Sequence, residues 1–373
     1  MKITSVSTHA LRYPLPKTYG GSHYDYSQRD FLLVKVTADN GLVGWGETAL
    51  FGGVRSLIDG TLGPAVIGQD PRRHRHLWQK MWGWNFGNGM AVGGLDIALE
   101  DLRGKATGMS LSDLHGGRVR DRVPVYASSL NYTQGIDPLQ SYPADAKELV
   151  ARGFKAMKLR IGRQPFRQDM NMVAAVRQAV GPNVMLLADG NAGYTLASAV
   201  QVGKELERQG LYWFEEPLPE ANYAGYEALR EKLDIALAGG EVLNGRGDAR
   251  EIIARRAIDI IQPDVTLCGG FAECLFIAEM AALWGITCNP HCYGGPIAAV
   301  ATLHLLSLLP EPNLSYTPEV PMLELDVSPS PLMERLVRQP LSLADGQMPV
   351  PTGPGLGIEI DEDVLREFEV VNN

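Results

Sequence analysis

Three carboxylates stand at equal intervals along the chain, and each one closes an apolar run. Asp189, Glu215 and Glu241 are separated by 26 and 26 residues. One strand, one helix and two short loops fill such an interval, so a parallel barrel would place all three at the carboxyl ends of successive strands, where barrel active sites are built. Converging acids cannot all stay ionised without a cation, and oxygen ligands favour a hard ion. The spacing therefore predicts a Mg²⁺ site.

Other predicted strand ends carry polar groups as well. Lys158 and Arg160 share one face of the strand 156–161 because side chains alternate along a strand. Glu216 lies one residue outside the inward register, so we expect it to contact Lys158 or Arg160 rather than the metal. The polar residues at the remaining strand ends are Asn191, Asp264, His291 and Glu319.

His291 is the candidate general base. It lies 27 residues after Asp264, so adjacent barrel strands would bring the two side chains together. A neighbouring carboxylate fixes the tautomer of a histidine and raises its basicity. His304 lies within an apolar helix and is expected to pack. His23 and Tyr24 belong to the polar loop 20–25, which could close over a substrate or remain a solvated loop.

The elements that must position these residues fall into two domains, as a length of 373 residues suggests. Residues 1–122 predict an α+β cap: alternating strands, a hairpin turn at 39–41, and helices over 53–114. Residues 123–344 predict a parallel α/β barrel, and 345–373 a segment that returns to the cap. The expected barrel strands are 123–126, 156–161, 184–189, 211–215, 235–241, 259–264, 286–291 and 314–319.

Composition excludes several classes of protein. The net charge of −9 argues against nucleic acid or an anionic membrane as a partner. The N-terminus lacks an apolar signal core and the chain has no run of about 18 apolar residues, so we expect a cytoplasmic location. The four cysteines are expected to be buried reduced thiols, with a redox or metal role as the alternative. Trp78, Trp82 and Trp84 are expected to pack between cap and barrel, or else to cover a substrate.

Several motifs resemble the enolase superfamily, mandelate racemase subgroup. The matching segments are Gly-Trp-Gly-Glu at 44–47, residues 96–105, Phe-Glu-Glu-Pro at 214–217, residues 238–241, Gln-Pro-Asp at 262–264 and residues 353–360. The resemblance implies a modified (β/α)7β TIM barrel with an α+β capping domain formed by the N-terminus and the C-terminal tail. It also implies cap loops near 18–28 and 50–55 that select the substrate, and a homo-oligomer.

The resemblance assigns roles to individual residues. Asp189, Glu215 and Glu241 correspond to the ligands of one Mg²⁺ per subunit, and His291 with Asp264 to the catalytic pair. Lys158 and Arg160 would bind the substrate carboxylate, and a divalent metal would stabilise the enediolate formed on proton removal. Further substrate contacts are expected from Asn191, Glu319, His23, Tyr24 and Glu216.

One departure from the family pattern narrows the reaction. The subgroup usually has Lys-x-Lys on the second strand, and this chain has Lys158-Leu159-Arg160. Arginine is always protonated, so Arg160 is a poor second base. Members that rely on the histidine alone resemble sugar-acid dehydratases, which make a 2-keto-3-deoxy acid. The predicted function is therefore a Mg²⁺-dependent hydro-lyase acting on a small sugar acid.

Two alternatives to the hydro-lyase remain. The segments around Asp264 and His291 look similar to aldarate-lactone cycloisomerases, and an epimerase would use the same enolate chemistry. Those two isomerase reactions form the first alternative; the second is a metal-stabilised binding protein without catalysis, but a binder has no need of the histidine–aspartate pair. Dehydration loses water, whereas isomerisation conserves mass, so the product distinguishes the hydro-lyase from the isomerases.

Overall fold

An antiparallel sheet opens the chain and forms the base of the cap. The computed structural model describes residues 1–83, 87–310, 321–339 and 341–370. Strands β1 (Ile3–Gly20), β2 (Asp25–Ala38) and β3 (Val43–Thr48) pair in the order β3-β2-β1, with the short β5 (Tyr132–Thr133) beside β1. The turn predicted at 39–41 joins β2 to β3, and Gly41 adopts a φ of 81° there. The predicted hairpin is confirmed.

Helices follow the cap strands, as predicted for 53–114. They are α1 (Val54–Leu57), a single π-helical turn η1 (Ile58–Leu62), α2 (Gly63–Val66), α3 (His74–Trp82), α4 (Gly89–Thr107) and α5 (Leu111–Leu114). The buried helix α4 packs on β3 at very short range because glycines in β3 lack a side chain. A Cβ at Gly46 would come within 2.0 Å of the Gly94 carbonyl oxygen.

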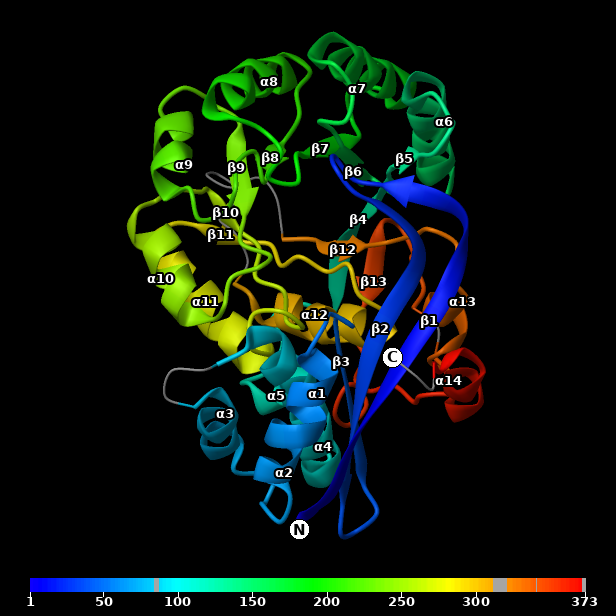
Figure 1. Cartoon of the computed structure of the whole chain (residues 1–373), viewed down its shortest axis with the longest axis vertical. Helices are drawn as coiled ribbons and strands as arrows, with labels where there is room; N and C mark the ends of the chain where they lie inside the picture. Colours follow the sequence, from blue (N-terminus) through cyan, green and yellow to red (C-terminus); the bar gives the residue numbers. More distant parts are fainter. Residues whose placement is uncertain (84–86, 311–320, 340, 371–373) are drawn as a thin grey trace.

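The barrel alternates strands and helices and forms the upper body in Figure 1. Its strands are β4 (Arg122–Leu130), β6 (Ala156–Arg160), β7 (Met185–Asp189), β8 (Trp213–Glu215), β9 (Ala236–Gly239), β10 (Ile260–Ile261), β11 (Thr287–Cys288) and β12 (Leu323–Leu325). Its helices are α6 (Pro138–Ala151), α7 (Phe166–Val180), α8 (Leu196–Arg208), α9 (Tyr223–Arg230), α10 (Arg246–Ala254), α11 (Phe271–Leu283), α12 (Pro296–Leu308) and α13 (Pro331–Arg335).

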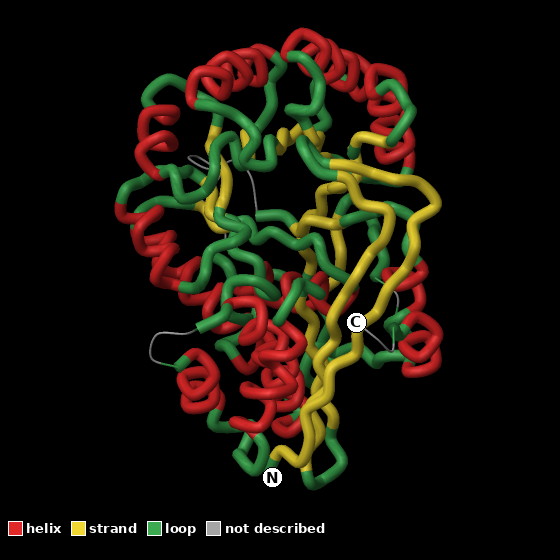
Figure 2. Tube along the Cα trace, viewed as in Figure 1, coloured by secondary structure: helices red, strands yellow, loops and turns green. Residues whose placement is uncertain are grey.

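The barrel strands form one curled parallel sheet in the order β12-β4-β6-β7-β8-β9-β10-β11. Helices cover its outer face, as Figure 2 shows, so the strands are buried on both faces. The inner face is filled by a separate apolar cluster that includes Tyr126, Leu187, Trp213, Ile260 and Met322. This cluster forms a solid floor beneath the strand ends and leaves the polar residues above it.

The eighth strand is β12, and its position corrects the sequence prediction. β12 pairs in parallel with β4, and Leu323 lies opposite Val125. The sequence prediction had placed this strand at 314–319, a segment outside the described residues. Across the gap between β11 and β12, the described residues show a side-chain link in place of ladder pairing: Asn289 exchanges hydrogen bonds of 2.7 and 3.1 Å with the backbone of Met322.

The C-terminal tail connects the barrel to the cap. Its strand β13 (Gln347–Pro349) first pairs antiparallel with β4, and helix α14 (Glu362–Phe368) then lies beside β1. Glu369 forms a bridge with Leu11, so the tail ends on the cap sheet. The architecture of a modified barrel with a two-part cap is confirmed. The exact domain boundaries at 122 and 344 stay predictions.

Three smaller predictions concern cysteines, tryptophans and hydropathy. The four cysteines are buried free thiols. Trp78 stacks on Trp82 and donates a 2.8 Å hydrogen bond to the Gly269 carbonyl oxygen in the barrel, so packing between cap and barrel is confirmed for this pair. Trp84 lies outside the described residues. Among the helices that the structure describes, none combines the length and apolar character needed to cross a membrane.

Candidate active site

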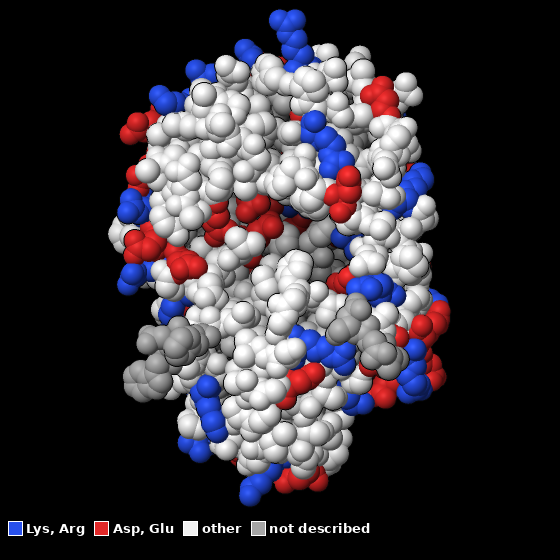
Figure 3. Space-filling view, in the orientation of Figure 1, with Lys and Arg blue, Asp and Glu red and all other residues white. Residues whose placement is uncertain are grey.

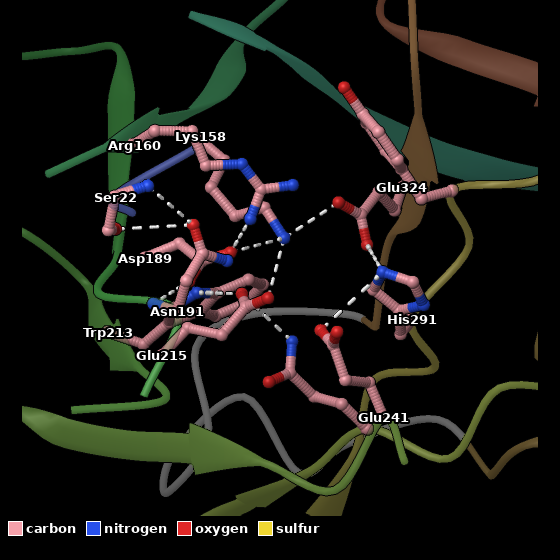
Figure 4. Close-up of polar contacts among 12 residues, drawn as sticks. Ser22, Lys158, Arg160, Asp189, Asn191, Trp213, Glu215, Glu241, His291 and Glu324 are labelled. Atoms are coloured by element: carbon pink, nitrogen blue, oxygen red, sulfur yellow. Dashed lines mark hydrogen bonds and ion pairs between the residues drawn. The ribbon is translucent and has the colours of Figure 1, made fainter. Parts of the chain in front are cut away.

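Charged residues meet at the carboxyl ends of the barrel strands, where the parallel register aligns them. Arg160 in β6 lies opposite Asp189 in β7, which lies opposite Glu215 in β8. All three side chains are buried. Figure 4 shows them facing one another across the strand ends, with Glu241, His291 and Glu324 on the other side of the same space. Glu324 apart, the strands that carry these residues lie where the sequence predicts them, and the residues meet at the strand ends as expected.

Lys158 is the centre of the buried ion pairs. Its Nζ lies 2.6 Å from Glu215 Oε1, 2.7 Å from Glu324 Oε1 and 3.5 Å from Asp189 Oδ2. Burial lowers the pKa of Lys158, but the two glutamates outweigh this effect and raise it. The side chain is therefore a fixed ammonium group, because a buried charge is tolerated only when it is well paired.

Glu215 is held from the barrel floor as well as by Lys158. The Trp213 indole donates a 3.0 Å hydrogen bond to Glu215 Oε2, and the Gln262 amide donates one of 3.1 Å to the same oxygen. Trp213 belongs to the apolar cluster inside the barrel, so its ring is fixed by packing. The orientation of Glu215 is thus set by Trp213 and Gln262, which hold one carboxylate oxygen, and by Lys158, which holds the other.

Asp189 connects the strand ends to the cap. Arg160 forms an ion pair with Asp189 Oδ2, while Oδ1 accepts a 2.8 Å hydrogen bond from the Asn191 backbone. Asn191 adopts a φ of 43°, in the left-handed region that asparagine tolerates better than most residues. Its side-chain oxygen accepts a 3.1 Å hydrogen bond from the Ser22 backbone at the tip of the cap ribbon.

His291 and Asp264 form the pair that the sequence predicts. His291 Nδ1 lies 2.7 Å from Asp264 Oδ2, and Asp264 Oδ1 accepts hydrogen bonds of 2.6 Å from both the backbone and the hydroxyl of Thr266. The other ring nitrogen, Nε2, faces Glu241 at 3.5 Å and Glu324 at 3.8 Å. Because Asp264 engages Nδ1, Nε2 is the nitrogen directed into the space above the strands.

The carboxylates around His291 control its charge. Burial lowers the pKa of His291, but Glu241, Glu324 and Asp264 outweigh it and raise the pKa to about 10. A histidine acts as a base only when neutral. The surplus of negative charge that raises this pKa must therefore be compensated before His291 can accept a proton.

Glu324 is a site residue that the sequence analysis missed. Its Oε2 accepts a 3.1 Å hydrogen bond from the Cys292 backbone, and Lys158 pairs with its other oxygen. Burial raises the pKa of Glu324, but Lys158, His291 and Arg160 outweigh it and hold the pKa well below the usual range. The sequence placed strand eight too early and assigned its carboxylate to Glu319, which lies outside the described residues. The apolar run Met322–Leu325 around one glutamate is the signal that could have located it.

Glu216 does not make the contact predicted for it. The described residues include no ion pair between Glu216 and Lys158 or Arg160, so this prediction is wrong. Glu216 is buried with a φ of 39°, and burial together with Glu241 and Glu215 raises its pKa well above the ordinary value.

The tip of the β1–β2 ribbon reaches across the barrel mouth. Figure 1 shows the ribbon running from the cap to the strands β6 and β7. Arg163 holds the tip through Asp25 Oδ1 at 2.6 Å and through the Tyr24 carbonyl oxygen. His23 and Tyr24 are exposed at this tip. The predicted loop therefore covers part of the site, while substrate contact by His23 and Tyr24 stays a prediction.

The open space in front of the strand ends is visible in Figure 3 as a hollow in which acidic side chains gather. Burial and Glu241 raise the pKa of Glu220 to about 7, and burial with Glu241 and Glu215 also raises that of Glu216. Lys158 and Arg160 therefore do not neutralise all of the acidic side chains around the strand ends. The donor set of Asp189, Glu215 and Glu241, all oxygen, thus fits a divalent hard cation.

The arrangement of those carboxylates is not a preformed coordination sphere. In the part of the chain that the structure describes, no three histidine, cysteine or acidic side chains are grouped closely enough to hold a metal ion. Lys158 and Arg160 contact Asp189, and Lys158 also contacts Glu215. A cation that binds these carboxylates must therefore compete with two basic side chains for the same oxygens.

Family models match most of the chain and identify its class. Residues 141–364 match the enolase C-terminal domain-like family, and residues 8–116 match the N-terminal domain of mandelate racemase and muconate lactonizing enzyme. The barrel, the cap and the strand-end carboxylates agree with that match. The chain belongs to the enolase superfamily, in the mandelate racemase and muconate lactonizing enzyme subgroup, and it is an enzyme of that superfamily.

Relatives within the subgroup carry names of two reaction types. The chain is 35% identical to D-galactarolactone cycloisomerase of Agrobacterium fabrum, with 99% of each chain covered. It is 30% identical to arabinonate dehydratase of Saccharolobus solfataricus, with 91% of each covered. The solved structure of 3,6-anhydro-D-galactonate cycloisomerase from Zobellia galactanivorans superposes with a TM-score of 0.89 at 29% identity, covering 99% of this chain and 100% of that one.

Proposed function

We propose that the enzyme eliminates an oxygen substituent from the carbon β to a carboxylate of a sugar acid. The reaction begins with removal of the proton on the α-carbon and passes through an enediolate. The observation that carries the proposal is the His291–Asp264 pair, whose Nε2 is directed at the same space as the strand-end carboxylates and two buried cations. With water as leaving group, the product is a 2-keto-3-deoxy acid.

The metal in this proposal is one Mg²⁺ per subunit, held by Asp189, Glu215 and Glu241. A divalent ion at these carboxylates would supply positive charge to offset the charge that develops on the substrate carboxylate during proton removal. The oxygen-only donor set and the uncompensated negative charge around Glu216 and Glu220 support it. The same positive charge would offset the carboxylates that keep His291 protonated.

The protein residues then have separate roles. Asp264 holds His291 through Nδ1, so that Nε2 takes the α-proton. Lys158 and Arg160 would bind the substrate carboxylate from the wall opposite His291, while Asp189 and Glu215, which they contact, would hold the metal. Glu324, fixed by Lys158 and the Cys292 backbone, borders the same space and would contact a substrate hydroxyl.

A single base favours elimination over racemisation. A racemase needs bases on opposite faces of the α-carbon, and the wall facing His291 carries Lys158 and Arg160. Arginine does not give up its proton, and the glutamates beside Lys158 raise its pKa further. Arg160 therefore cannot accept a proton near neutral pH, and Lys158 is engaged by Glu215 and Glu324, so His291 is the base that this proposal assigns.

The leaving group separates two candidate functions. A hydroxyl leaves only if an acid protonates it, and His291 after proton transfer, Glu319 or a cap residue could supply that proton. Glu324 is a poor acid because its pKa is lowered. In an aldarolactone the β-oxygen belongs to the ring ester and departs as a carboxylate, which requires no acid.

Ring opening is the second candidate function, and the identity to D-galactarolactone cycloisomerase over 99% of the chain specifically favours it.

The further substrate contacts that we propose come from Asn191, Glu319, His23, Tyr24 and Glu216. A homo-oligomer and a cytoplasmic location also remain proposals, the first from family resemblance and the second from the four free cysteines.

A mass-resolved screen in deuterated water with Mg²⁺ tests the proposal. The probes are D-galactarolactone, arabinonate, D-galactonate and the corresponding aldaric acids. Loss of water with a new 2-keto acid establishes the dehydratase, and an isomeric keto acid formed from the lactone establishes the cycloisomerase. Conversion of a probe into its α-epimer, without elimination, would contradict the single-base proposal.

A further inference from the structure

Two neighbouring cap residues contact both barrel loops that carry the catalytic pair. Glu47 and Thr48 end strand β3, and each side chain is 1% exposed. Glu47 reaches the loop that follows His291, and Thr48 reaches the loop that follows Asp264. The contacts join residues that are more than 200 positions apart in the chain, since the Glu47–Gly295 and Thr48–Thr266 separations are 248 and 218 residues.

Glu47 caps the helix that begins just after His291. Helix α12 starts at Pro296, and Gly295 before it has no side chain with which to cap the helix itself. The Glu47 carboxylate accepts a hydrogen bond from the Gly295 backbone and another, of 3.2 Å, from the Ala298 backbone. A carboxylate at a helix N-terminus satisfies free N–H groups and complements the helix dipole. The start of α12 is therefore fixed by the cap.

Close packing leaves this carboxylate little freedom. A Cβ at Gly294 would lie 2.7 Å from Glu47 Oε1, and one at Gly295 would lie 2.9 Å from Oε2. The loop between His291 and α12 thus fits around the carboxylate because it contains two consecutive glycines. Closer to His291 in the same loop, the Cys292 backbone is held by Glu324. The loop is consequently tied at two points within four residues of the base.

Thr48 is the first of a continuous series of contacts that ends at His291. Its hydroxyl lies 2.9 Å from the Thr266 carbonyl oxygen and 2.9 Å from that of Met90. Thr266 in turn donates two hydrogen bonds to Asp264 Oδ1. Asp264 Oδ2 engages His291 Nδ1. The orientation of the Asp264 carboxylate therefore depends on where Thr266 is held.

Helix α4 braces the Thr48–Thr266 contact from the side. A Cβ at Gly94 would lie 2.8 Å from Thr48 Cγ2, and one at Gly93 would lie 2.6 Å from the Thr266 carbonyl oxygen. The backbone of α4 can approach this closely only because both residues are glycine. Side chains packed this tightly transmit small displacements instead of absorbing them.

We propose that Glu47 and Thr48 are positioning residues that set the orientation of the His291–Asp264 pair from the cap. The inference rests on the proposed role of His291 as the base. Proton transfer depends steeply on geometry, and a misplacement of about 1 Å costs about 100-fold in rate. Loss of an outer hydrogen-bond partner of a catalytic group commonly costs about 10–100-fold.

The kinetic test compares Thr48→Val with Thr48→Ser in the Mg²⁺-loaded protein, with D-galactarolactone and arabinonate as probes. Valine keeps the shape and removes the hydroxyl, whereas serine keeps the hydroxyl. We expect Thr48→Val to lower kcat about 10-fold or more with little change in KM, and to raise the kinetic isotope effect of an α-deuterated probe. Thr48→Ser should restore most of kcat.

A matched control separates positioning from loss of cap stability. Thr8 lies in β1 of the same sheet and donates a 2.8 Å hydrogen bond to Asp59, within the cap. Thr8→Val should lower stability as Thr48→Val does, yet leave kcat and the isotope effect at the wild-type values. Equal losses of kcat in both valine variants would show that the cap acts only through stability and would overturn the proposal.

A second readout needs no turnover. Amide hydrogen exchange should increase in Thr48→Val over 264–268, and in Glu47→Gln over 291–298, relative to wild type. Unchanged exchange in both segments would overturn the proposal. His291→Asn in the same assays keeps the two ideas distinct. If His291→Asn retains activity, the proposed function fails; if it is inactive while Thr48→Val has wild-type kcat, only the positioning inference fails.

Discussion

Two buried histidine–carboxylate clusters in this molecule invite comparison. His291 lies 2.7 Å from Asp264 at the barrel strand ends, and His74 lies 2.6 Å from Asp96 between cap helices α3 and α4. Both imidazoles are buried, and both have a raised pKa. For His74, burial lowers the pKa, but Glu100 and Asp96 outweigh it and raise it to about 9.

The difference lies in which ring nitrogen each carboxylate contacts. His74 Nε2 faces both Asp96 and Glu100, the latter at 3.2 Å, so both carboxylates hold the same nitrogen. Asp264 instead holds Nδ1 of His291, and Nε2 faces the space in front of the strands. A histidine paired with an acid is therefore not a catalytic signature by itself. The free nitrogen must also be directed at a place where a substrate fits.

The cap cluster has a structural role that explains its composition. Asp96 Oδ2 accepts a 2.9 Å hydrogen bond from the Phe271 backbone at the start of barrel helix α11. Glu100 is contacted by Arg103 at 2.9 Å and by His115 at 3.0 Å. The Phe271 contact fastens the cap to the barrel, and the Arg103 and His115 contacts hold the cap together, so the positive charge on His74 balances buried acids instead of serving chemistry.

The largest expected effect distinguishes the two histidines by activity. His291→Asn removes the base and should lower kcat by about 1,000-fold or more, since general bases contribute about 100- to 10,000-fold. His74→Asn should leave kcat within about twofold of wild type at a temperature where the variant is folded. Steady-state assays with the active probe check both variants. Comparable losses of kcat in the two variants would contradict the assignment of catalysis to His291 and of a structural role to His74.

Asp264 and Asp96 should differ as His291 and His74 do, but substitution of Asp264 should lower kcat less than substitution of His291. Asp264→Asn preserves shape but loses the charge that orients His291, and we expect kcat to fall about 100-fold. Asp96→Asn should act on stability and leave kcat near the wild-type value. Thermal unfolding and kcat measured on the same preparations decide between these outcomes.

The cap histidine should matter for stability and not for activity. Removing His74 leaves Asp96 and Glu100 buried with less compensation, and breaking a buried ion pair costs about 3–5 kcal/mol. We expect His74→Asn to lower the free energy of unfolding by an amount near the low end of that range, because Arg103 and His115 still pair with Glu100. Urea unfolding at pH 6 measures it. A change under about 1 kcal/mol would argue against a fastening role.

The smallest expected effect is a pH dependence of the difference in free energy of unfolding between wild type and His74→Asn. The pKa of His74 is about 9 in the folded state against an ordinary value of 6.5, so its protonated form stabilises the fold. This contribution is complete below about pH 6.5 and is lost as the pH rises through about 9. The stability gap between wild type and His74→Asn should therefore narrow between these values. A gap that widens over the same window would contradict the assignment.

The sequence predicted the histidine–carboxylate pair of the barrel because regular spacing along the chain indicates which residues end neighbouring strands. The strands expected at 156–161 and 184–189 are found within one residue of their predicted bounds, because each is an apolar run. Equal intervals then placed Asp189 and Glu215 opposite each other. Asp264 and His291 met for the same reason, although the paired parts of β10 and β11 end before both residues.

The remaining features depend on packing that no local pattern encodes. Strand eight was displaced in the prediction because 314–319 and 322–325 each contain one glutamate, and pairing with β4 selects the second segment. The contacts of Lys158 with Glu215 and Glu324 arise from side chains that reach across the barrel. Glu47 and Thr48 contact loops more than 200 residues away, so the cap's hold on the base was invisible in the sequence.

The central claim is that one base, His291, removes the α-proton. It is tested most directly by running the Mg²⁺-loaded enzyme part way to completion in deuterated water and analysing the unreacted sugar acid or lactone by NMR. With a single base we expect elimination product and no α-epimer of the starting material, because the wall opposite His291 presents Lys158 and Arg160 instead of a second base. Accumulation of a deuterated α-epimer would contradict it.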